Sequence, residues 1–374
     1  MTDEQPIRWW RTELGADEAD AVARAIADRR INRGSVCARL ERELAERLGF
    51  AHVLLTSSGS AALALALQAC GVGPGDEVIV PAATFIATAH APRLLGATVR
   101  LADVRPDRPL LDPASLEAAI TPRTRAVIPV HLGGGICDMP AILAVARRHG
   151  LAVVEDCAQA LGSRRDGRSV GRSGRAGAFS MSIAKLITTG EGGFVATDDP
   201  DLHDRLHRLH NQGVRVIFDN VYDAPGFNLR FNDLLAAVGL VQVGRLPEKI
   251  AAVRRVREFY ARELADLPYL RMLPVDLAGG ELPAWSQVLC ADRDRVVRLL
   301  AERGIQTRPI YPCLADSPHL GCPGAFPRAR HLCARVLTLP SGPDQRPTDL
   351  DRVVHTLHEI APLVAAPAEE PVHG

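Results

Sequence analysis

The sequence predicts an α/β protein with a large domain built on a mostly parallel sheet and a smaller α+β domain after it. Short runs rich in Val, Ile and Leu alternate with segments of helical spacing through the first two-thirds of the chain. This alternation is typical of repeated β–α–β units. The strand-like runs are continuously apolar, as expected for strands that are covered on both faces. After about residue 245 the alternation ends, so we predict a large domain over 1–245 and a small domain over 246–374.

The expected elements can be placed in order along the chain. Six apolar runs that end in turn residues are predicted strands, namely 52–59, 77–85, 98–104, 125–134, 151–160 and 192–199. Helical spacing between them predicts helices at 60–70, 85–96, 115–120 and 139–150. The second part contains predicted helices at 246–267, 292–305 and 350–363 and a strand at 284–291. The composition of 365–374 predicts disorder.

Composition argues against several classes of protein. The chain has 44 basic and 44 acidic side chains, whereas proteins that bind nucleic acid or anionic membranes usually carry a basic excess. The N-terminal stretch lacks the apolar segment of a signal peptide, and no apolar run approaches the roughly 18 residues of a membrane span. The eight cysteines form no C-x-x-C pair, so we expect reduced thiols. We therefore expect a cytoplasmic protein without nucleic-acid or membrane partners.

Lys185 is the strongest single candidate for chemistry. Only two of the 44 basic side chains are lysines, Lys185 and Lys249, and the others are arginines. Lysine can lose its proton and attack a carbonyl to form an imine, whereas arginine keeps its proton and cannot. Lys185 follows a strand predicted at 176–182. Lys249 lies among charges on the predicted helix 246–267, and we expect it to be an ordinary surface residue.

Two further segments place polar residues just after predicted strands, where ligands gather in folds of this kind. Ser58, Gly59 and Ser60 precede a helix, so their free backbone N–H groups form either an anion site or an ordinary helix cap. Asp156 is either a cap for a following helix or the partner of a pyridinium nitrogen. Gln159, one turn further on, is expected to face the same ligand.

Other patterns favour structural explanations. The glycines of 71–76 imitate a dinucleotide fingerprint, but they precede a strand, so we predict a loop. His203, His207 and His210 have helical spacing that could bind a metal, but no carboxylate–histidine signature accompanies them, so we expect a solvated helix face and no metal. No GxSxG elbow or Walker lysine is present, which leaves serine-hydrolase and P-loop chemistry without support.

Six stretches resemble the DegT/DnrJ/EryC1/StrS sugar aminotransferase family. They are SSGSAALALAL, GVGPGDEVIVPAATFIATAHA, ITPRTRAVIPVHLGG, VVEDCAQALGS, GRSGRAGAFSMSIAKLITTGEGGFVATDD and GFNLRFNDLLAAVGLVQ. The likeness is strong over residues 10–250 and continues weakly to about residue 365, and all six stretches in sequence are highly specific. The resemblance implies a fold-type-I enzyme that uses pyridoxal 5′-phosphate (PLP) and is a homodimer with active sites at the subunit interface.

The resemblance also implies roles for the residues singled out above. Lys185 matches the family's Schiff-base lysine, and Asp156 matches the partner of the pyridine nitrogen. Gln159 matches the neighbour of the ring's 3′-oxygen, and Phe85 matches the aromatic residue that stacks on the ring.

Further matches concern the phosphate of the cofactor. Ser58 belongs to the turn that meets the phosphate. In this turn, Gly59 and Ser60 match backbone donors to the phosphate, and Ser180 adds a hydroxyl. Asn228 matches the asparagine that reaches the phosphate from the other subunit.

The sequence departs from the family pattern on the substrate side. Many members carry an aromatic–His–Pro run before the lysine, where this chain has residues 181–184, and Gly133 replaces the usual aromatic after PVHL. Candidates for contact with the acceptor are His131, Arg230 and His319.

We therefore predict a PLP-dependent aminotransferase that moves an amino group from glutamate or glutamine to a nucleotide-linked keto-sugar in amino-sugar biosynthesis. The alternative acceptor is a keto-cyclitol on an aminoglycoside antibiotic route. A PLP-dependent sugar dehydratase is less consistent, because such family members replace the lysine with histidine and this chain keeps Lys185. A regulatory protein that binds PLP without turnover has no need of the set Lys185, Asp156 and Gln159.

Overall fold

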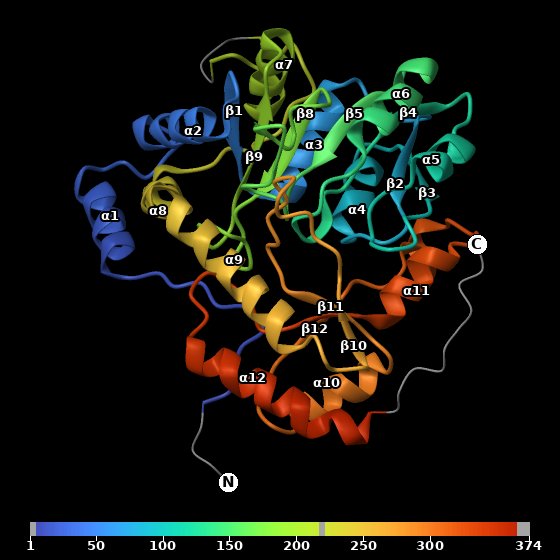
Figure 1. The fold of residues 1–374 in the computed structure, drawn as a ribbon. Helices are drawn as coiled ribbons and strands as arrows, with labels where there is room; N and C mark the ends of the chain where they lie inside the picture. Colours follow the sequence, from blue (N-terminus) through green and yellow to red (C-terminus); the bar gives the residue numbers. More distant parts are fainter. Residues whose placement is uncertain (1–4, 217–220, 365–374) are drawn as a thin grey trace.

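The computed structural model describes residues 5–216 and 221–364, and it contains two main β-sheets (Figure 1). The larger sheet lies in the upper half of the view. The smaller sheet lies in the lower half, beside helices α10 (Arg293–Ala301) and α12 (Pro347–Ile360). The long helix α9 (Leu246–Glu263) runs from one half to the other.

The larger sheet has seven strands in the order β1-β9-β8-β5-β4-β2-β3. Its strands are β1 (His52–Thr56), β2 (Glu77–Pro81), β3 (Thr98–Ala102), β4 (Thr124–Val127), β5 (Ala152–Asp156), β8 (Ala176–Ser180) and β9 (Gly193–Thr197). Neighbours from β8 to β3 are parallel, whereas β9 is antiparallel to both β1 and β8. Every residue of β2 and β9 is buried, which explains their continuous apolar character. The predicted mostly parallel sheet is confirmed.

Helices connect and cover these strands. They are α3 (Gly59–Ala69), α4 (Ala87–Leu94), α5 (Pro113–Ala119), α6 (Met139–His149) and α7 (Pro200–His210). The helix α3 is buried on nearly all sides, and its N-cap Ser58 accepts a hydrogen bond from the Ala61 N–H at 3.1 Å. The four helices predicted between the strands are confirmed, with ends that differ by a few residues.

Three further helices, α1 (Ala16–Ala27), α2 (Ser35–Leu48) and α8 (Asp233–Gly244), pack together beside β1. Asp233, the first residue of α8, accepts hydrogen bonds from the N–H groups of Gly34 and Cys37, both at 2.9 Å. A carboxylate at a helix N-terminus stabilises the helix because it satisfies unpaired N–H groups and faces the positive end of the dipole. Asp233 therefore fixes α2 against α8.

The connection between β8 and β9 determines where Lys185 lies. Because the two strands are antiparallel neighbours, residues 181–192 must turn at the carboxyl end of β8, which is also the edge where β1 and β5 end. The loop is closed by hydrogen bonds from the N–H of Met181 to the Gly192 carbonyl (2.8 Å) and from the N–H of Thr189 to the Met181 carbonyl (2.9 Å). Lys185 therefore lies on the loop that follows β8.

The smaller sheet is antiparallel, in the order β10-β11-β13-β12. Its elements are β10 (Leu270–Met272), β11 (Gln287–Cys290), β12 (Arg308–Pro309) and β13 (Val336–Thr338), with α11 (Pro327–Arg335) leading into β13. The N-terminal segment joins this part, since the Ile7 N–H donates to the Gly304 carbonyl at 2.9 Å and the Ile7 carbonyl accepts from the Gln306 N–H at 2.9 Å. The domain boundary between 245 and 246 stays a prediction.

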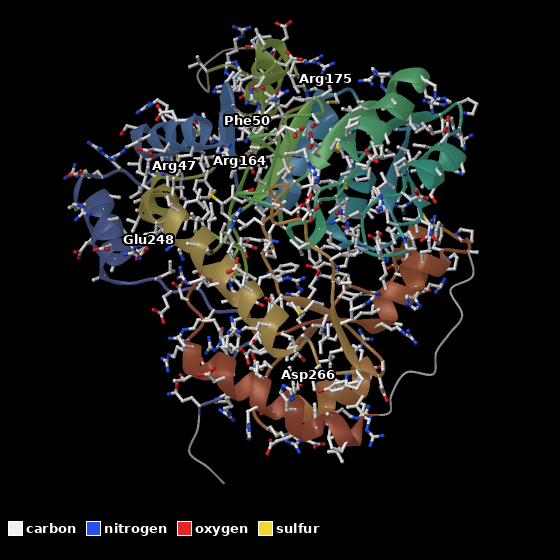
Figure 2. The ribbon with its side chains drawn as sticks, in the orientation of Figure 1. Arg47, Phe50, Arg164, Arg175, Glu248 and Asp266 are labelled. Carbon is white, nitrogen blue, oxygen red and sulfur yellow. The ribbon has the colours of Figure 1, made fainter. Side chains whose placement is uncertain are left out.

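The environment of Lys249 differs from the expected surface position. Figure 2 labels Glu248, near the start of α9, and Asp266, just beyond its end, so the helix can be followed between the two sheets. Lys249 is only 5% exposed, and its Nζ donates to Thr12 Oγ1 and Asp344 Oδ2, both at 3.2 Å. The expected surface position is wrong, because this amine ties the N-terminal segment to the loop before α12.

The remaining elements are short. They are the hairpin β6 (Arg164–Arg165) and β7 (Arg168–Ser169) and the 3₁₀ turns η1 (Leu132–Gly134), η2 (Leu314–Asp316), η3 (Pro318–Leu320) and η4 (Ala361–Leu363). The guanidinium of Arg164 donates to the Arg47 carbonyl at 2.7 Å, and Figure 2 labels both residues. All eight cysteines are free thiols, as expected. Within 5–216 and 221–364, no helix is long and apolar enough to cross a membrane. The segment 365–374, predicted to be disordered, lies outside the described residues.

Candidate active site

The carboxyl edge of the larger sheet gathers most of the predicted site residues. Ser58, Gly59 and Ser60 follow β1, Gln159 follows β5, and Lys185 follows β8. In the sheet order β1-β9-β8-β5 these three strands lie close together, and all three end at the same edge. The predicted clustering at strand ends is therefore what the topology produces.

Lys185 is half-buried, and its amine lies against the Trp285 ring with Nζ 5.4 Å from the ring centroid. Burial lowers the pKa of this amine to about 8; the charge of Asp156 opposes the shift and that of Arg308 adds to it. Within the described residues Nζ has no hydrogen-bond or ion-pair partner. The side chain is thus an amine that can change its protonation near neutral pH.

Asp156 is 5% exposed at the end of β5. Its Oδ2 accepts from the Thr88 hydroxyl at 2.8 Å, and its Oδ1 accepts from the Ala158 N–H at 3.1 Å. Burial raises the pKa of the carboxyl, and these two hydrogen bonds and the charge of Lys185 oppose the rise. Residues 157–163 form turns and no helix, so the alternative of a helix cap is wrong. The carboxylate is instead available to hold a cationic group.

Gln159 is 6% exposed, and its side chain bridges two parts of the chain. Its Oε1 accepts from the Gly133 N–H at 2.9 Å, and its Nε2 donates to the Tyr311 hydroxyl at 3.2 Å. The amide is therefore held in one orientation, between the loop after β4 and the segment after β12.

The turn before α3 forms a cradle for an anion. The N–H groups of Gly59 and Ser60 belong to the first turn of α3 and have no acceptor within the part of the chain that the structure describes. A Cβ added to Gly59 would lie 2.8 Å from the Ser180 Cβ and 3.2 Å from its Oγ, so glycine permits this close approach. Two free N–H groups at a helix N-terminus, beside the serine hydroxyls, suit a phosphate.

Aromatic side chains from distant segments are linked by ring contacts that begin at Trp285, the ring against the amine. Phe85 is 44% exposed, and its ring centroid lies 5.1 Å from that of Tyr311. Trp9 packs edge-on against Trp285 at 6.0 Å, and the Arg308 guanidinium lies 4.8 Å from the Trp9 ring centroid. Phe85 is a predicted site residue, whereas the other four are not.

Several residues near the site were not predicted from the sequence, and they differ in whether the sequence contained a signal for them. The stretch RPIYPCL, which contains Arg308 and Tyr311, resembles the family weakly, so these two residues had a signal. Thr88 lies three residues after Phe85, in a stretch that also matches the family. For Trp9 and Trp285 no motif was available.

Asn228 and Arg230 lie on a segment that passes behind the anion cradle. The carbonyl of Leu229, between them, accepts from the Ser57 N–H at 3.0 Å. Asn228 is exposed, and its Oδ1 accepts from the Arg230 Nε at 2.8 Å. Neither side chain contacts Lys185 or Asp156 within the described part of this one chain.

His131 is fully buried and both of its ring nitrogens are used. Nδ1 accepts from the Cys137 N–H at 3.2 Å, which leaves Nε2 to donate to Glu155 at 2.9 Å. Side chains of consecutive strand residues point to opposite faces, so Glu155 points away from Asp156. His131 and Glu155 border a cavity of about 450 Å³ whose lining does not include Lys185. The placement gives His131 no free group for an acceptor.

His319, the third candidate for acceptor contact, is exposed on a 3₁₀ turn. Its Nε2 lies 2.8 Å from the Nε2 of His90 on α4, and its carbonyl accepts from the Arg93 guanidinium at 3.2 Å. These contacts join the second part of the chain to α4, and the structure gives His319 no contact with Lys185.

The three helical histidines only partly match the expectation of a solvated face. His210 is 1% exposed, whereas His203 and His207 are half-buried on α7. The His203 ring stacks on His52 with 4.4 Å between centroids. Within the described residues, the one group of three potential ligands that lies close enough for a metal is His131, Glu155 and Cys157.

That group is already satisfied. Glu155 accepts from the N–H groups of Gly171, Ser173 and Gly174 at 2.6–2.9 Å, in addition to its bond with His131. A carboxylate with four donors has no free lone pair to offer a cation.

The two departures from the family pattern, residues 181–184 and Gly133, differ in their surroundings. Met181 is fully buried and Ile183 is 57% exposed, so the run before Lys185 alternates between core and surface. Gly133 has φ +62°, and a Cβ there would lie 2.7 Å from Gln287 Oε1. An aromatic residue at this position would displace Gln287 from its present place.

Comparisons with known proteins agree with this geometry. A profile of the DegT/DnrJ/EryC1/StrS aminotransferase family matches residues 12–358. GDP-perosamine synthase of Caulobacter vibrioides is 37% identical over 369 residues, which cover 96% of this chain and 100% of that protein. The erythromycin biosynthesis sensory transduction protein EryC1 of Saccharopolyspora erythraea is 40% identical over 353 residues, 92% of this chain and 95% of that protein. The crystal structure of DesV from S. venezuelae with a ketimine intermediate has a TM-score of 0.91 at 36% identity, covering 96% of this chain and 99% of DesV.

Proposed function

The chain belongs to the DegT/DnrJ/EryC1/StrS aminotransferase family, and on that premise we propose its amino donor, its acceptor and the residues that act. It is a PLP-dependent sugar aminotransferase with the fold-type-I architecture expected from the sequence. We propose that glutamate or glutamine supplies the nitrogen and that a nucleotide-linked keto-sugar receives it. The relative GDP-perosamine synthase, whose name specifies a GDP-linked sugar, supports a nucleotide-linked acceptor.

The residues at the carboxyl edge fit PLP. Its phosphate would be held by the N–H groups of Gly59 and Ser60 and by the Ser180 hydroxyl, in the cradle that a Cβ on Gly59 would fill. Phe85, exposed at the mouth of the site, would cover the ring. Lys185 would hold the cofactor through Nζ. When bound, PLP supplies an electron sink for the electrons left on the substrate carbon as it loses its proton.

Lys185 would also move that proton. Because burial brings the pKa of Nζ to about 8, the amine can both give up and take back a proton close to neutral pH, which is the requirement for a general acid–base group. The amine is also free to approach a substrate, since no described residue binds it.

Asp156 would keep the ring nitrogen of the cofactor cationic. Its two oxygens are fixed by Thr88 and Ala158, so the carboxylate keeps one orientation and can form a charge-assisted hydrogen bond to that nitrogen. Gln159, held between Gly133 and Tyr311, would lie beside the ring's 3′-oxygen.

The observation that carries this proposal is an amine without a hydrogen-bond or ion-pair partner among the described residues. Its charge interacts with a buried carboxylate, and it lies at the same edge of the larger sheet as a helix N-terminus that lacks an acceptor there. The test is to reduce the holoprotein with borohydride, digest it and locate the added cofactor mass by mass spectrometry. The chain has only two lysines, so Lys249→Ala is a matched control that should keep the modification. Lys185→Ala should lose it, together with amino transfer. A modified peptide that contains Lys249, or no modified peptide, would contradict the proposal.

A panel of acceptors tests the substrate. The holoprotein, loaded with nitrogen from glutamate or glutamine, is offered nucleotide-linked keto-sugars, free keto-sugars and keto-cyclitols. We expect amine formation only from the nucleotide-linked compounds. Turnover of a keto-cyclitol alone would replace the proposed acceptor and leave the proposed chemistry of Lys185 in place.

We also propose a homodimer in which each site is completed by the partner. Asn228 is exposed beside the anion cradle rather than inside it, and the exposed apolar side chains Ile183, Tyr222 and Phe227 (57%, 71% and 65%) suit burial against a second copy. Mixing Asn228→Ala with Lys185→Ala protein should restore part of the activity, because one hybrid site would be intact. Proven subunit exchange without restored activity would contradict a shared site.

A further inference from the structure

Among the described residues, Arg308 is a cation without an anionic partner, and it is linked to the amine of Lys185 through the rings of Trp9 and Trp285. It lies on the two-residue strand β12, where its backbone pairs with Thr338 of β13. Some half-buried arginines of the chain face carboxylates, such as Arg108, which lies 2.9 Å from Glu281, and others donate to backbone carbonyls, such as Arg303 to Leu299 at 3.0 Å. In the part of the chain that the structure describes, the Arg308 guanidinium has neither an ion pair nor a hydrogen bond.

The guanidinium is held by aromatic rings instead. Its central carbon lies 4.8 Å from the Trp9 ring centroid and 5.5 Å from that of Tyr311. Aromatic faces attract a cation but do not neutralise its charge, and they leave the N–H donors of the guanidinium edge unused. The rings therefore orient Arg308 without satisfying it.

The backbone of Arg308 is held by strand pairing. Pro309 follows it on β12, and the two residues pair with Thr338 and Leu337. Tyr311 is fixed in turn by the hydrogen bond from Gln159. A binding group on such a frame loses little conformational entropy when a ligand arrives.

The charges of Asp156 and Arg308 both act on the amine of Lys185, in opposite directions. Burial is the main reason that the pKa of Lys185 is lowered; the charge of Asp156 opposes this shift, and the charge of Arg308 adds a smaller contribution to it. An unpaired guanidinium in a half-buried site is unfavourable until an anion binds to it. The pocket therefore requires a ligand that brings its own negative charge.

We propose that Arg308 binds the α-carboxylate of the amino-acid donor, an inference that rests on the proposed function of Lys185. In an α-amino acid the carboxylate is bonded to the carbon that carries the amine, so a donor whose nitrogen reaches Lys185 must place its carboxylate nearby. In a nucleotide-linked sugar the diphosphate is separated from a ring ketone by the sugar itself. Arg308 is linked to the amine through the contacting rings of Trp9 and Trp285, and its charge acts on Lys185. This placement matches the donor better than the acceptor. The planar guanidinium can bind both carboxylate oxygens at once.

The first test measures the donor half-reaction of the holoenzyme in single turnovers. Glutamate is compared with 4-aminobutyrate, which lacks the α-carboxylate. Arg308→Met should raise the half-saturating glutamate concentration at least tenfold, as expected for the loss of a charge-assisted contact, and it should leave the reaction of 4-aminobutyrate unchanged. Arg308→Lys should recover part of the loss. Arg262, which lies 5.6 Å from the Phe259 ring, provides the control Arg262→Met, which should behave as wild type.

The second test is a binding measurement that needs no turnover. Glutarate, which has the carboxylates of glutamate but no amine, is titrated into the holoenzyme by calorimetry. We expect the dissociation constant to rise at least tenfold in Arg308→Met and less in Arg308→Lys. If Arg308→Met does not fold, the Arg308→Lys and Arg308→Gln variants provide the same comparison.

The outcomes separate this inference from the proposed function. If wild type accepts nitrogen from glutamate and the Arg308 variants do so equally well, or if glutarate binds wild type and variants alike, the inference about Arg308 is wrong while Lys185 keeps its role. A defect confined to the half-reaction with the keto-sugar would assign Arg308 to the acceptor. That result would also overturn the inference that Arg308 binds the donor carboxylate. If wild type reacts with no donor, the proposed function fails, and glutarate binding still decides whether Arg308 holds a carboxylate.

Discussion

Replacing Lys185 by Met is expected to stabilise the cofactor-free protein, whereas the same replacement of Lys249 is expected to destabilise it. The two lysines have opposite surroundings: Lys249 Nζ donates to Thr12 and Asp344, but Lys185 Nζ has no such partner among the described residues. A group placed for chemistry rather than for packing commonly reduces stability.

The size of the stability change in Lys185→Met follows from the pKa shift of the Lys185 amine. Burial lowers the pKa of Lys185 from 10.5 to about 8, and each unit corresponds to about 1.4 kcal/mol. At pH 7 the protonated amine therefore destabilises the fold by at most about 3.5 kcal/mol, and solvent screening of this half-buried side chain reduces the figure to about 2 kcal/mol. For Lys249→Met we expect a loss of about 1–3 kcal/mol, because Asp344 would lose its partner.

The sign of the pH dependence is also fixed. Between pH 8 and 10.5 the unfolded chain holds a proton on Lys185 that the folded chain has released, so the stability of wild type rises with pH relative to Lys185→Met. Below pH 8 both states are protonated and the difference is constant. The advantage of Lys185→Met should therefore shrink as the pH rises above 8.

The assay is urea unfolding of cofactor-free wild type, Lys185→Met and Lys249→Met at equal protein concentration, at pH 7.0 and 9.5. The reasoning is refuted if Lys185→Met is less stable than wild type at pH 7.0, or if the difference does not change between the two pH values.

Two further predictions concern the buried carboxylates. Thr88→Val should cost about 1–2 kcal/mol of unfolding free energy, because Asp156 loses a buried donor; Thr88→Ser, measured in the same urea titration, should restore it, and equal loss in both variants would assign the effect to packing. Burial alone would raise the pKa of Glu155, but His131 and two backbone N–H groups lower it, so Glu155→Gln should cost about 2–4 kcal/mol at pH 7. This second difference should fall as the pH drops below 4.5, and a pH-independent difference in thermal unfolding would contradict the role given to the charge.

Much of the fold follows from local patterns. The apolar runs and the helical spacing predict the strands of the larger sheet with ends within a few residues, because a strand buried on both faces needs apolar side chains at every position. The ends were less predictable; residues 157–163, for example, form turns after β5 where a helix was an alternative. From the sequence, a carboxylate at a strand end such as Asp156 fits both a helix cap and a ligand site, and local residues do not distinguish the two.

The residues of the candidate site likewise include some that local sequence predicts and some that it does not. Lys185 could be singled out because only two of the 44 basic residues are lysines, and imine formation requires the primary amine of a lysine. Lys249 shows the limit of that argument, since nothing local predicts its contacts with Thr12 and Asp344. Those contacts require the N-terminal segment and the loop before α12 to meet at α9.

The sequence by itself determined the alternation of strands and helices, the small-residue turn at Ser58–Ser60 before a helix and the presence of an amine after β8, because each depends on residues within a few positions of one another. Only the tertiary structure decided that Trp9, Trp285 and Arg308 surround that amine. Their meeting depends on how the smaller sheet and the N-terminal segment bury their apolar faces, and that packing joins residues about 300 positions apart that share no local pattern.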